Sequence, residues 1–127
     1  LGMSLGALIG GIVVSIDHRL KAAVLMSGVG SFTDVASLNV PELSGEALDR
    51  YRGIMAAIDP QAYIGKAAPT QLLFQYGNQD VFPREKLIAF AEGGSEPKKV
   101  IEYEAGHYLN EQARDDAVAW LVEALGR

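Results

Sequence analysis

The sequence predicts a three-layer α/β/α fold in which helices cover both faces of a parallel β-sheet. Continuous apolar runs at residues 22–27 and 70–76 are typical of strands buried on both faces. Residues 99–104 form a third strand candidate, and segments with helical spacing separate these runs. A serine flanked by glycines opens the chain, at the spacing of a sharp turn from strand to helix. This alternation indicates a single α/β domain.

The opening turn is predicted from the pattern Gly2-x-Ser4-x-Gly6. A nucleophile at the tip of such a turn has a strained backbone, and the residues two before and two after it must be nearly free of side chains. Residues 5–16 are apolar on nearly every side, so we expect a helix packed in the interior. The short pattern also fits a serine at the start of a glycine-rich helix.

The middle of the chain has the weakest pattern. After the strand at 22–27, residues 32–66 show apolar side chains at roughly helical spacing only within 46–58. Asp59 and Pro60 form a stop signal after that segment. We predict one amphipathic helix there, preceded by a loop.

The second half of the chain alternates regularly. The strand at 70–76 leads to a helix at 84–91, which Pro83 opens. The strand at 99–104 is followed by a final helix over 111–125, which has apolar side chains on one side.

The composition is that of an ordinary globular domain and excludes several function classes. With 49% hydrophobic and 21% charged residues, the 127-residue chain can build one core. A net charge of −5 and the absence of a basic run argue against nucleic-acid or anionic-membrane partners. Without cysteine there is no disulfide, thiolate nucleophile or cysteine-bound metal. The apolar segment 5–16 is too short to span a bilayer. The sequence does not indicate where in the cell the protein is located, and the cytoplasm is the default expectation.

Three polar residues follow predicted strands. Ser4 follows the first short strand, Asp80 follows the strand at 70–76, and His107 follows the third. Because the carboxyl ends of parallel strands lie at one edge of a sheet, these side chains can converge. The other of the two histidines, His18, precedes its strand and therefore belongs at the opposite edge.

Asp80 has an alternative role, and a second aspartate is an alternative candidate for the acid. Asp80 could instead cap the amino end of the helix that begins at Pro83. Asp34, which follows the strand at 22–27, is a second candidate for a catalytic acid.

Family resemblance rests on three stretches that together span nearly the whole chain. They are the serine pattern at 2–6, the segment from Asp59-Pro60 through 68–83, and the Gly-His pair within 105–107. Their order, Ser then Asp then His, is that of α/β-hydrolases and not that of chymotrypsin-like or subtilisin-like proteases. The sequence resembles the C-terminal half of an α/β-hydrolase-fold enzyme, most closely the dienelactone-hydrolase and prolyl-oligopeptidase-like branch of esterases and peptidases.

This resemblance implies a serine hydrolase with Ser4, Asp80 and His107 as its triad. Ser4 would attack a carbonyl carbon to form an acyl-enzyme, His107 would carry the proton, and Asp80 would orient the imidazole. The expected substrate is a small-molecule ester, ahead of a peptide or thioester, and neither a metal nor an organic cofactor is needed. The backbone N–H of Leu5, at the amino end of the first helix, is the expected oxyanion donor.

Other outcomes stay open at this point. Met3, Gly28 and Phe82 are expected to line the mouth of the pocket. The same triad would also serve an acyltransferase. Alternatively, the chain is a catalytically silent or split segment that acts as a structural or interaction module.

We expect residues 1–127 to be the C-terminal part of a single α/β-hydrolase domain. A full member of the family has further strands before the serine turn, and a loop among them supplies a second oxyanion donor. Loss of one such donor costs on the order of 10²- to 10³-fold in turnover, so the chain alone should be weak or inactive. Without those strands the sheet would have an uncovered apolar edge, which favours association with another polypeptide chain. The expected partner is therefore the N-terminal half of the domain, or a self-association that replaces it.

Overall fold

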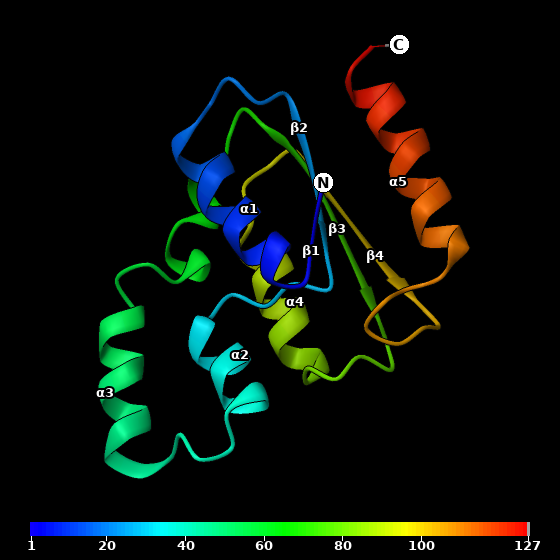
Figure 1. The fold of residues 1–127 in the computed structure, drawn as a ribbon. Coiled ribbons are helices and arrows are strands. Elements are labelled where there is room, and N and C mark those ends of the chain that lie inside the picture. Colours follow the sequence, from blue (N-terminus) through cyan, green and yellow to red (C-terminus); the bar gives the residue numbers. More distant parts are fainter. Residues whose placement is uncertain (127) are drawn as a thin grey trace.

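The computed structural model describes residues 1–126 and contains a four-stranded sheet in the order β1-β2-β3-β4, with every pair parallel (Figure 1). The strands are β1 (Gly2–Met3), β2 (Ala22–Met26), β3 (Gln71–Gly77) and β4 (Lys98–Tyr103). The α-helices are α1 (Leu5–Ile16), α2 (Phe32–Asn39), α3 (Gly45–Met55), α4 (Arg84–Gly93) and α5 (Glu111–Ala124), with short 3₁₀ turns η1 (Pro60–Ala62) and η2 (Ile64–Lys66). Within these residues, no helix combines the length and hydropathy that a membrane span requires.

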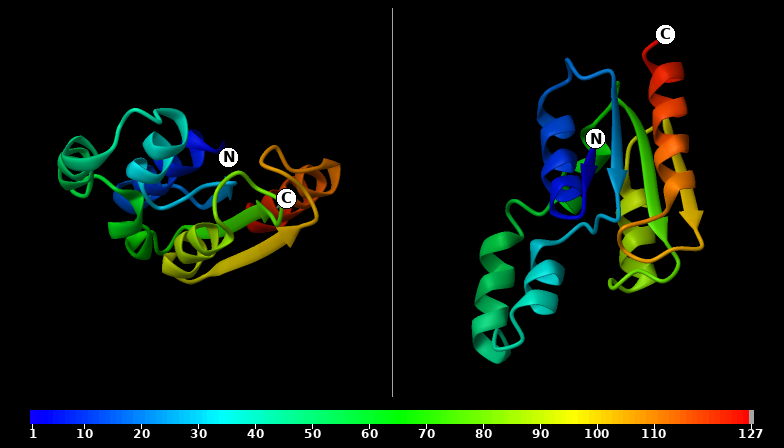
Figure 2. Two further views of the ribbon diagram at one scale, coloured as in Figure 1. Left: turned by 90° about the horizontal axis from the view of Figure 1, so that it is seen from below. Right: turned by 45° about the vertical axis from the view of Figure 1, so that its right-hand side comes forward.

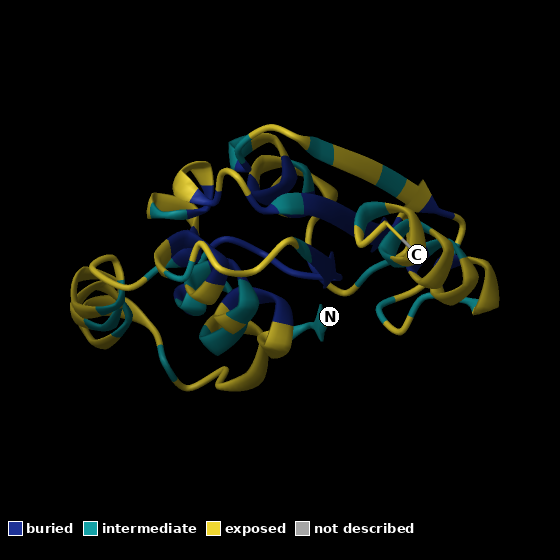
Figure 3. Cartoon of the chain, turned by 90° about the horizontal axis from the view of Figure 1, so that it is seen from above, coloured by how far each residue is buried: buried dark blue, intermediate teal, exposed yellow. Residues whose placement is uncertain are grey.

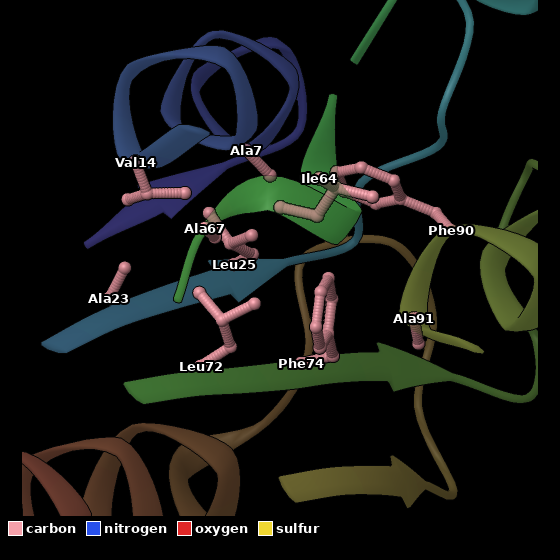
Figure 4. Packing of buried hydrophobic residues seen from close by; sticks show 10 residues of the cluster. All are labelled: Ala7, Val14, Ala23, Leu25, Ile64, Ala67, Leu72, Phe74, Phe90 and Ala91. Carbon is pink, nitrogen blue, oxygen red and sulfur yellow. The ribbon is translucent and has the colours of Figure 1, made fainter. Parts of the chain in front are cut away.

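One face of the sheet is covered by α1, η2 and α4. Because side chains alternate along a strand, Leu25 and Phe74 point to this face, where the Phe74 ring packs edge-on against Phe90 at 5.5 Å between centroids (Figure 4). The buried cluster consists of Ala7, Val14, Ala23, Leu25, Ile64, Ala67, Leu72, Phe74, Phe90 and Ala91.

The opposite face is covered by α5. Val24, Met26 and Leu73 alternate with the residues of the first face and pack against Ala113 and Ala117 of the helix. Two views show α1 and α5 on opposite sides of the strands (Figures 1 and 2). The predicted three-layer parallel fold is therefore confirmed.

A buried polar network also joins α5 to the sheet. Gln75 Nε2 donates to the Tyr103 hydroxyl at 2.6 Å and to the Ala113 carbonyl at 2.8 Å, and the Tyr103 hydroxyl donates to Asp116 at 2.9 Å. Burial, together with the bond to Asp116, raises the pKa of Tyr103 to about 12, so the hydroxyl keeps its proton. The network anchors the start of α5, and with it the end of the loop that carries His107.

Two parts of the prediction are corrected. Residues 5–16 do form α1, but the helix is not buried all round, because the side chains of Leu5, Ile9, Val13 and Ile16 are exposed. Residues 32–39, expected as a loop, form α2. The predicted helix over 46–58 ends at Met55 and has no buried residue (Figure 3). It contacts α2 beyond the carboxyl ends of the strands (Figures 1 and 2).

Candidate active site

Ser4 lies on a sharp kink between β1 and α1. Its backbone has φ 54° and ψ −119°, a conformation that side-chain-bearing residues rarely adopt. The Ser4 N–H donates to the Met26 carbonyl at 2.8 Å, which attaches the kink to the end of β2. A Cβ added to Gly2 would overlap with the Gly6 carbonyl oxygen, so the kink requires glycine at position 2.

Gly6 does not have the steric role that the pattern suggested. A Cβ built on Gly6 meets no atom within 4 Å among the residues described. The close approach runs from position 2 to the backbone of position 6, so only the first glycine is needed for it.

Asp80 lies in the turn after β3, and its side chain is fully buried. The Phe82 N–H donates to Asp80 Oδ1 at 3.0 Å. This carboxylate is not a helix cap, because α4 begins after Pro83 without a side-chain cap bond. The turn is tied to the loop after β4 by backbone bonds, from Asn78 N–H to the Tyr103 carbonyl at 2.9 Å and from Gln79 N–H to the Ala105 carbonyl at 3.0 Å.

His107 lies in the loop between β4 and α5. Its Nδ1 is 2.9 Å from Asp80 Oδ1, and its Nε2 is 2.9 Å from Ser4 Oγ. Because a carboxylate only accepts, we assign the ring proton to Nδ1, which leaves Nε2 to accept from the Ser4 hydroxyl. The fold thus joins the three residues predicted as the triad in one hydrogen-bonded chain, across 103 positions of sequence.

The alternative candidates lie elsewhere. Asp34 is in the first turn of α2, where its carboxylate is 3.4 Å from Lys86 Nζ. His18 is exposed in the turn between α1 and β2, at the amino ends of the strands. Among the residues described, no group of three or more His, Asp or Glu side chains could hold a metal ion.

A cavity of about 380 Å³ opens above Ser4 and His107. Its walls are mainly apolar, and the Phe82 ring packs edge-on against the imidazole at 5.6 Å between centroids. The lining residues are Ser4, Val35, Leu38, Asn39, Val81, Phe82, His107 and Tyr108.

Two of the guessed lining residues lie outside this cavity. Met3 packs against the cluster beneath α5, because it points to that face of the sheet. Gly28 is buried, and a Cβ there would press on Ala7 and Phe90 in the core.

Helix α2 contributes Val35, Leu38 and Asn39 to the cavity, which the sequence pattern did not predict. A signal for this helix was present, since Ser31 and Asp34 have the spacing of a helix start. In the structure the Ser31 hydroxyl accepts from the Thr33 N–H at 3.1 Å, and Asp34 lies in the first turn.

Leu5 is the first residue of α1. Its backbone N–H is among those that a helix start leaves without an intrahelical acceptor. It donates to no acceptor within residues 1–126. It directly follows Ser4, which is the location expected of an oxyanion donor.

Solved structures of hydrolases and esterases have a similar fold. The 2,6-dihydroxy-pseudo-oxynicotine hydrolase matches with a TM-score of 0.74 and 19% identity, over 98% of this chain and 39% of that chain. Est1E from Butyrivibrio proteoclasticus matches with a TM-score of 0.76 and 19% identity, over 99% and 60%. Acetyl xylan esterase 1 from Thermoanaerobacterium sp. JW/SL YS485 matches with a TM-score of 0.73 and 17% identity, over 97% and 44%.

The chain has an α/β-hydrolase fold. This confirms the resemblance predicted from the sequence. The chain spans between 39% and 60% of the length of these three proteins. No protein-family model and no curated protein matches the sequence.

Gly77 allows the turn that carries Asp80 and the loop that carries His107 to meet in this α/β-hydrolase fold. A Cβ at position 77 would overlap with the Ala105 carbonyl oxygen and approach that of Gly106 within 2.7 Å. Gly77→Ala should therefore push the two loops apart, lower the free energy of unfolding by roughly 1–3 kcal/mol, and lengthen the Asp80–His107 contact in a crystal structure. Gly53→Ala is the matched control, because a Cβ there meets nothing within 4 Å. It should stabilise α3 by up to about 1 kcal/mol. Equal effects of the two changes would contradict this account.

Proposed function

We propose that the chain carries the nucleophile, base and acid of a serine hydrolase that cleaves carboxylic esters. The observation that supports this best is the continuous contact from Ser4 Oγ through the His107 ring to Asp80, at 2.9 Å in both steps. A serine hydroxyl is a weak nucleophile unless a base accepts its proton, and a base acts well only when a third group fixes its orientation.

In the proposed acylation step, Ser4 Oγ attacks the ester carbonyl carbon while its proton moves to His107 Nε2. The tetrahedral intermediate carries a negative oxygen, which the Leu5 N–H stabilises. Asp80 holds the Nδ1–H side of the ring and stabilises the imidazolium without taking the proton. Collapse of the intermediate breaks the bond to the leaving oxygen, which receives the proton from His107 and departs as an alcohol.

In the deacylation step, water takes the place of the alcohol. The water oxygen attacks the acyl carbon of the acyl-Ser4 ester while His107 accepts a proton from the same water molecule. The second tetrahedral intermediate then releases the carboxylic acid, and the proton returns to Ser4 Oγ. The proton transfers in both steps use Ser4, His107, the ester and one water molecule.

The choice of an ester has support from structural neighbours. The chain is similar to acetyl xylan esterase 1, to an esterase domain from a Rhodothermus marinus protein, and to an enol-lactonase from Burkholderia xenovorans LB400. A peptide or thioester remains a second choice for the same chemistry.

Fluorophosphonate labelling in the complete protein tests the proposal. The reagent should phosphonylate Ser4, and Ser4→Ala should abolish the label because no other serine contacts an imidazole among the residues described. His107→Ala should slow labelling by about 10³-fold or more. Its matched control is His18→Ala, which removes an exposed imidazole at the other end of the sheet and should leave the rate unchanged.

The role of Asp80 can be tested by ester turnover in the complete protein. Asp80→Asn should lower ester turnover on the order of 10³- to 10⁴-fold, because an amide does not hold the ring in the required tautomer. Asp34→Asn changes the other acidic candidate, which contacts Lys86 instead, and should have no comparable effect. A folded wild-type protein that neither labels at Ser4 nor hydrolyses any ester would remove the proposal.

A second observation favours an interaction role for part of the surface. One side of α1 exposes four apolar side chains, which are Leu5, Ile9, Val13 and Ile16. Contiguous apolar surface of this kind is typical of a region that another polypeptide covers. We propose that further residues of the same hydrolase domain cover this side of α1, or that self-association does.

This proposal predicts how the chain behaves when residues 1–127 are produced alone. They should self-associate in analytical ultracentrifugation, and Ile9→Glu should reduce the association because it places a charge in the apolar stripe. Ile54→Glu is the control, since Ile54 is also exposed but lies on α3. A monomer that unfolds reversibly and cooperatively would speak against a covered α1.

A further inference from the structure

Ser27 is a buried hydroxyl that the proposed mechanism does not use. It directly follows β2, and none of its surface is exposed. Its backbone lies in the left-handed region, with φ 49°, where residues other than glycine are strained. Its N–H donates to the Gln75 carbonyl at 2.7 Å, which continues the pairing of β2 with β3 and fixes the residue in place.

The Ser27 hydroxyl reaches the loop of the base. Ser27 Oγ is 2.7 Å from the carbonyl oxygen of His107, 80 positions along the chain. Because a carbonyl only accepts, the hydroxyl is the donor. The bond is therefore directed at the backbone of the residue whose ring contacts Ser4.

The residue before Ser27 holds the nucleophile. The Met26 carbonyl accepts the Ser4 N–H at 2.8 Å. Two consecutive residues at the end of β2 thus bind the backbone of the nucleophile and the backbone of the base.

The base loop has few other connections to this side of the sheet. The Gln79 N–H joins it to the turn that carries Asp80, and the Asn78 N–H joins the same turn to Tyr103 at the end of β4, so these bonds fix His107 relative to Asp80. Apart from the Ser4–His107 contact itself, the Ser27 hydroxyl makes the one hydrogen bond that joins residues 104–110 to β1 or β2 in the described part of the chain. Without the bond from Ser27, only the contact between Ser4 Oγ and His107 Nε2 themselves would fix the distance between these two atoms.

We propose that Ser27 is a positioning residue, whose hydroxyl sets the distance between Ser4 Oγ and His107 Nε2 by holding the His107 carbonyl. This inference rests on the proposed serine-hydrolase function. The ring and the hydroxyl must meet at hydrogen-bond distance for proton transfer, and a misplacement of about 1 Å can cost on the order of 10²-fold in rate. Ser27 touches neither reacting atom and acts only through the backbone of the base.

The test uses two variants of Ser27 in the complete protein. Ser27→Ala removes the hydroxyl but keeps the strained backbone, whereas Ser27→Gly removes the hydroxyl and relieves the strain. Both should lower kcat for a p-nitrophenyl ester by roughly 10- to 100-fold. In both, KM should stay within about threefold, and fluorophosphonate labelling of Ser4 should slow by the same factor as kcat.

Thr70→Val is the matched control for loss of a buried hydroxyl. Thr70 is fully buried before β3, at the opposite end of the sheet, and its Oγ1 donates to the Leu20 carbonyl at 2.8 Å. This variant should lower the thermal midpoint about as much as Ser27→Gly and leave kcat unchanged.

The outcomes separate the two hypotheses. If the wild type labels and turns over esters but Ser27→Gly retains full kcat, or loses activity only in proportion to its unfolded fraction, the positioning role is wrong and the serine hydrolase stands. If the folded wild type neither labels nor hydrolyses esters, the proposed function fails and this inference fails with it. Should Ser27→Ala not fold, the strain-free Ser27→Gly decides.

Discussion

The parallel direction of the four strands is the constraint on which the rest of the structure depends. In this register Met3 pairs with Met26, Met26 pairs with Gln75, and Gly77 pairs with Tyr103. Because the strands end at neighbouring positions, the Ser4 kink, the turn that carries Asp80 and the loop that carries His107 lie at one edge of the sheet, although they are far apart in sequence. If one of these strands ran antiparallel to the others, the loop that follows it would lie at the opposite edge of the sheet. The site is therefore a consequence of topology before it is a consequence of any side-chain contact.

Backbone strain is concentrated at this same edge. Ser4, Ser27 and Leu109 are the residues other than glycine with positive φ in the described part of the chain. Each follows a strand at its carboxyl end, and such conformations cost roughly 1–3 kcal/mol apiece. Packing on both faces of the sheet stabilises the strained edge, through the cluster under α1 and α4 on one side and through α5 on the other. Within residues 1–126 the opposite edge has no such residue, which indicates that the strain belongs to the site.

Sequence patterns predicted the features that depend on local periodicity. The three longer strands and the helices α1, α4 and α5 follow from apolar runs, glycine and proline, and the meeting of Ser4, Asp80 and His107 follows from their locations after strands. Features that depend on distant contacts were missed. The role proposed for Ser27 depends on a carbonyl 80 residues away. For α2 the reason differs: Thr33 is its one buried residue, so its apolar spacing does not stand out and Ser31 and Asp34 are its local signal. The predicted steric role of Gly6 was wrong, because a sequence pattern does not reveal which glycine makes the close contact.

In the proposed mechanism Ser4, the His107 imidazole and the Leu5 N–H all act on the carbonyl group of one substrate molecule. A crystal structure of the complete protein after reaction with a fluorophosphonate tests this most directly. The account predicts phosphorus bonded to Ser4 Oγ, a phosphonyl oxygen within hydrogen-bond distance of the Leu5 N–H, and the His107 ring still beside Ser4. Phosphorus on another residue, or a phosphonyl oxygen directed away from the start of α1, would contradict it.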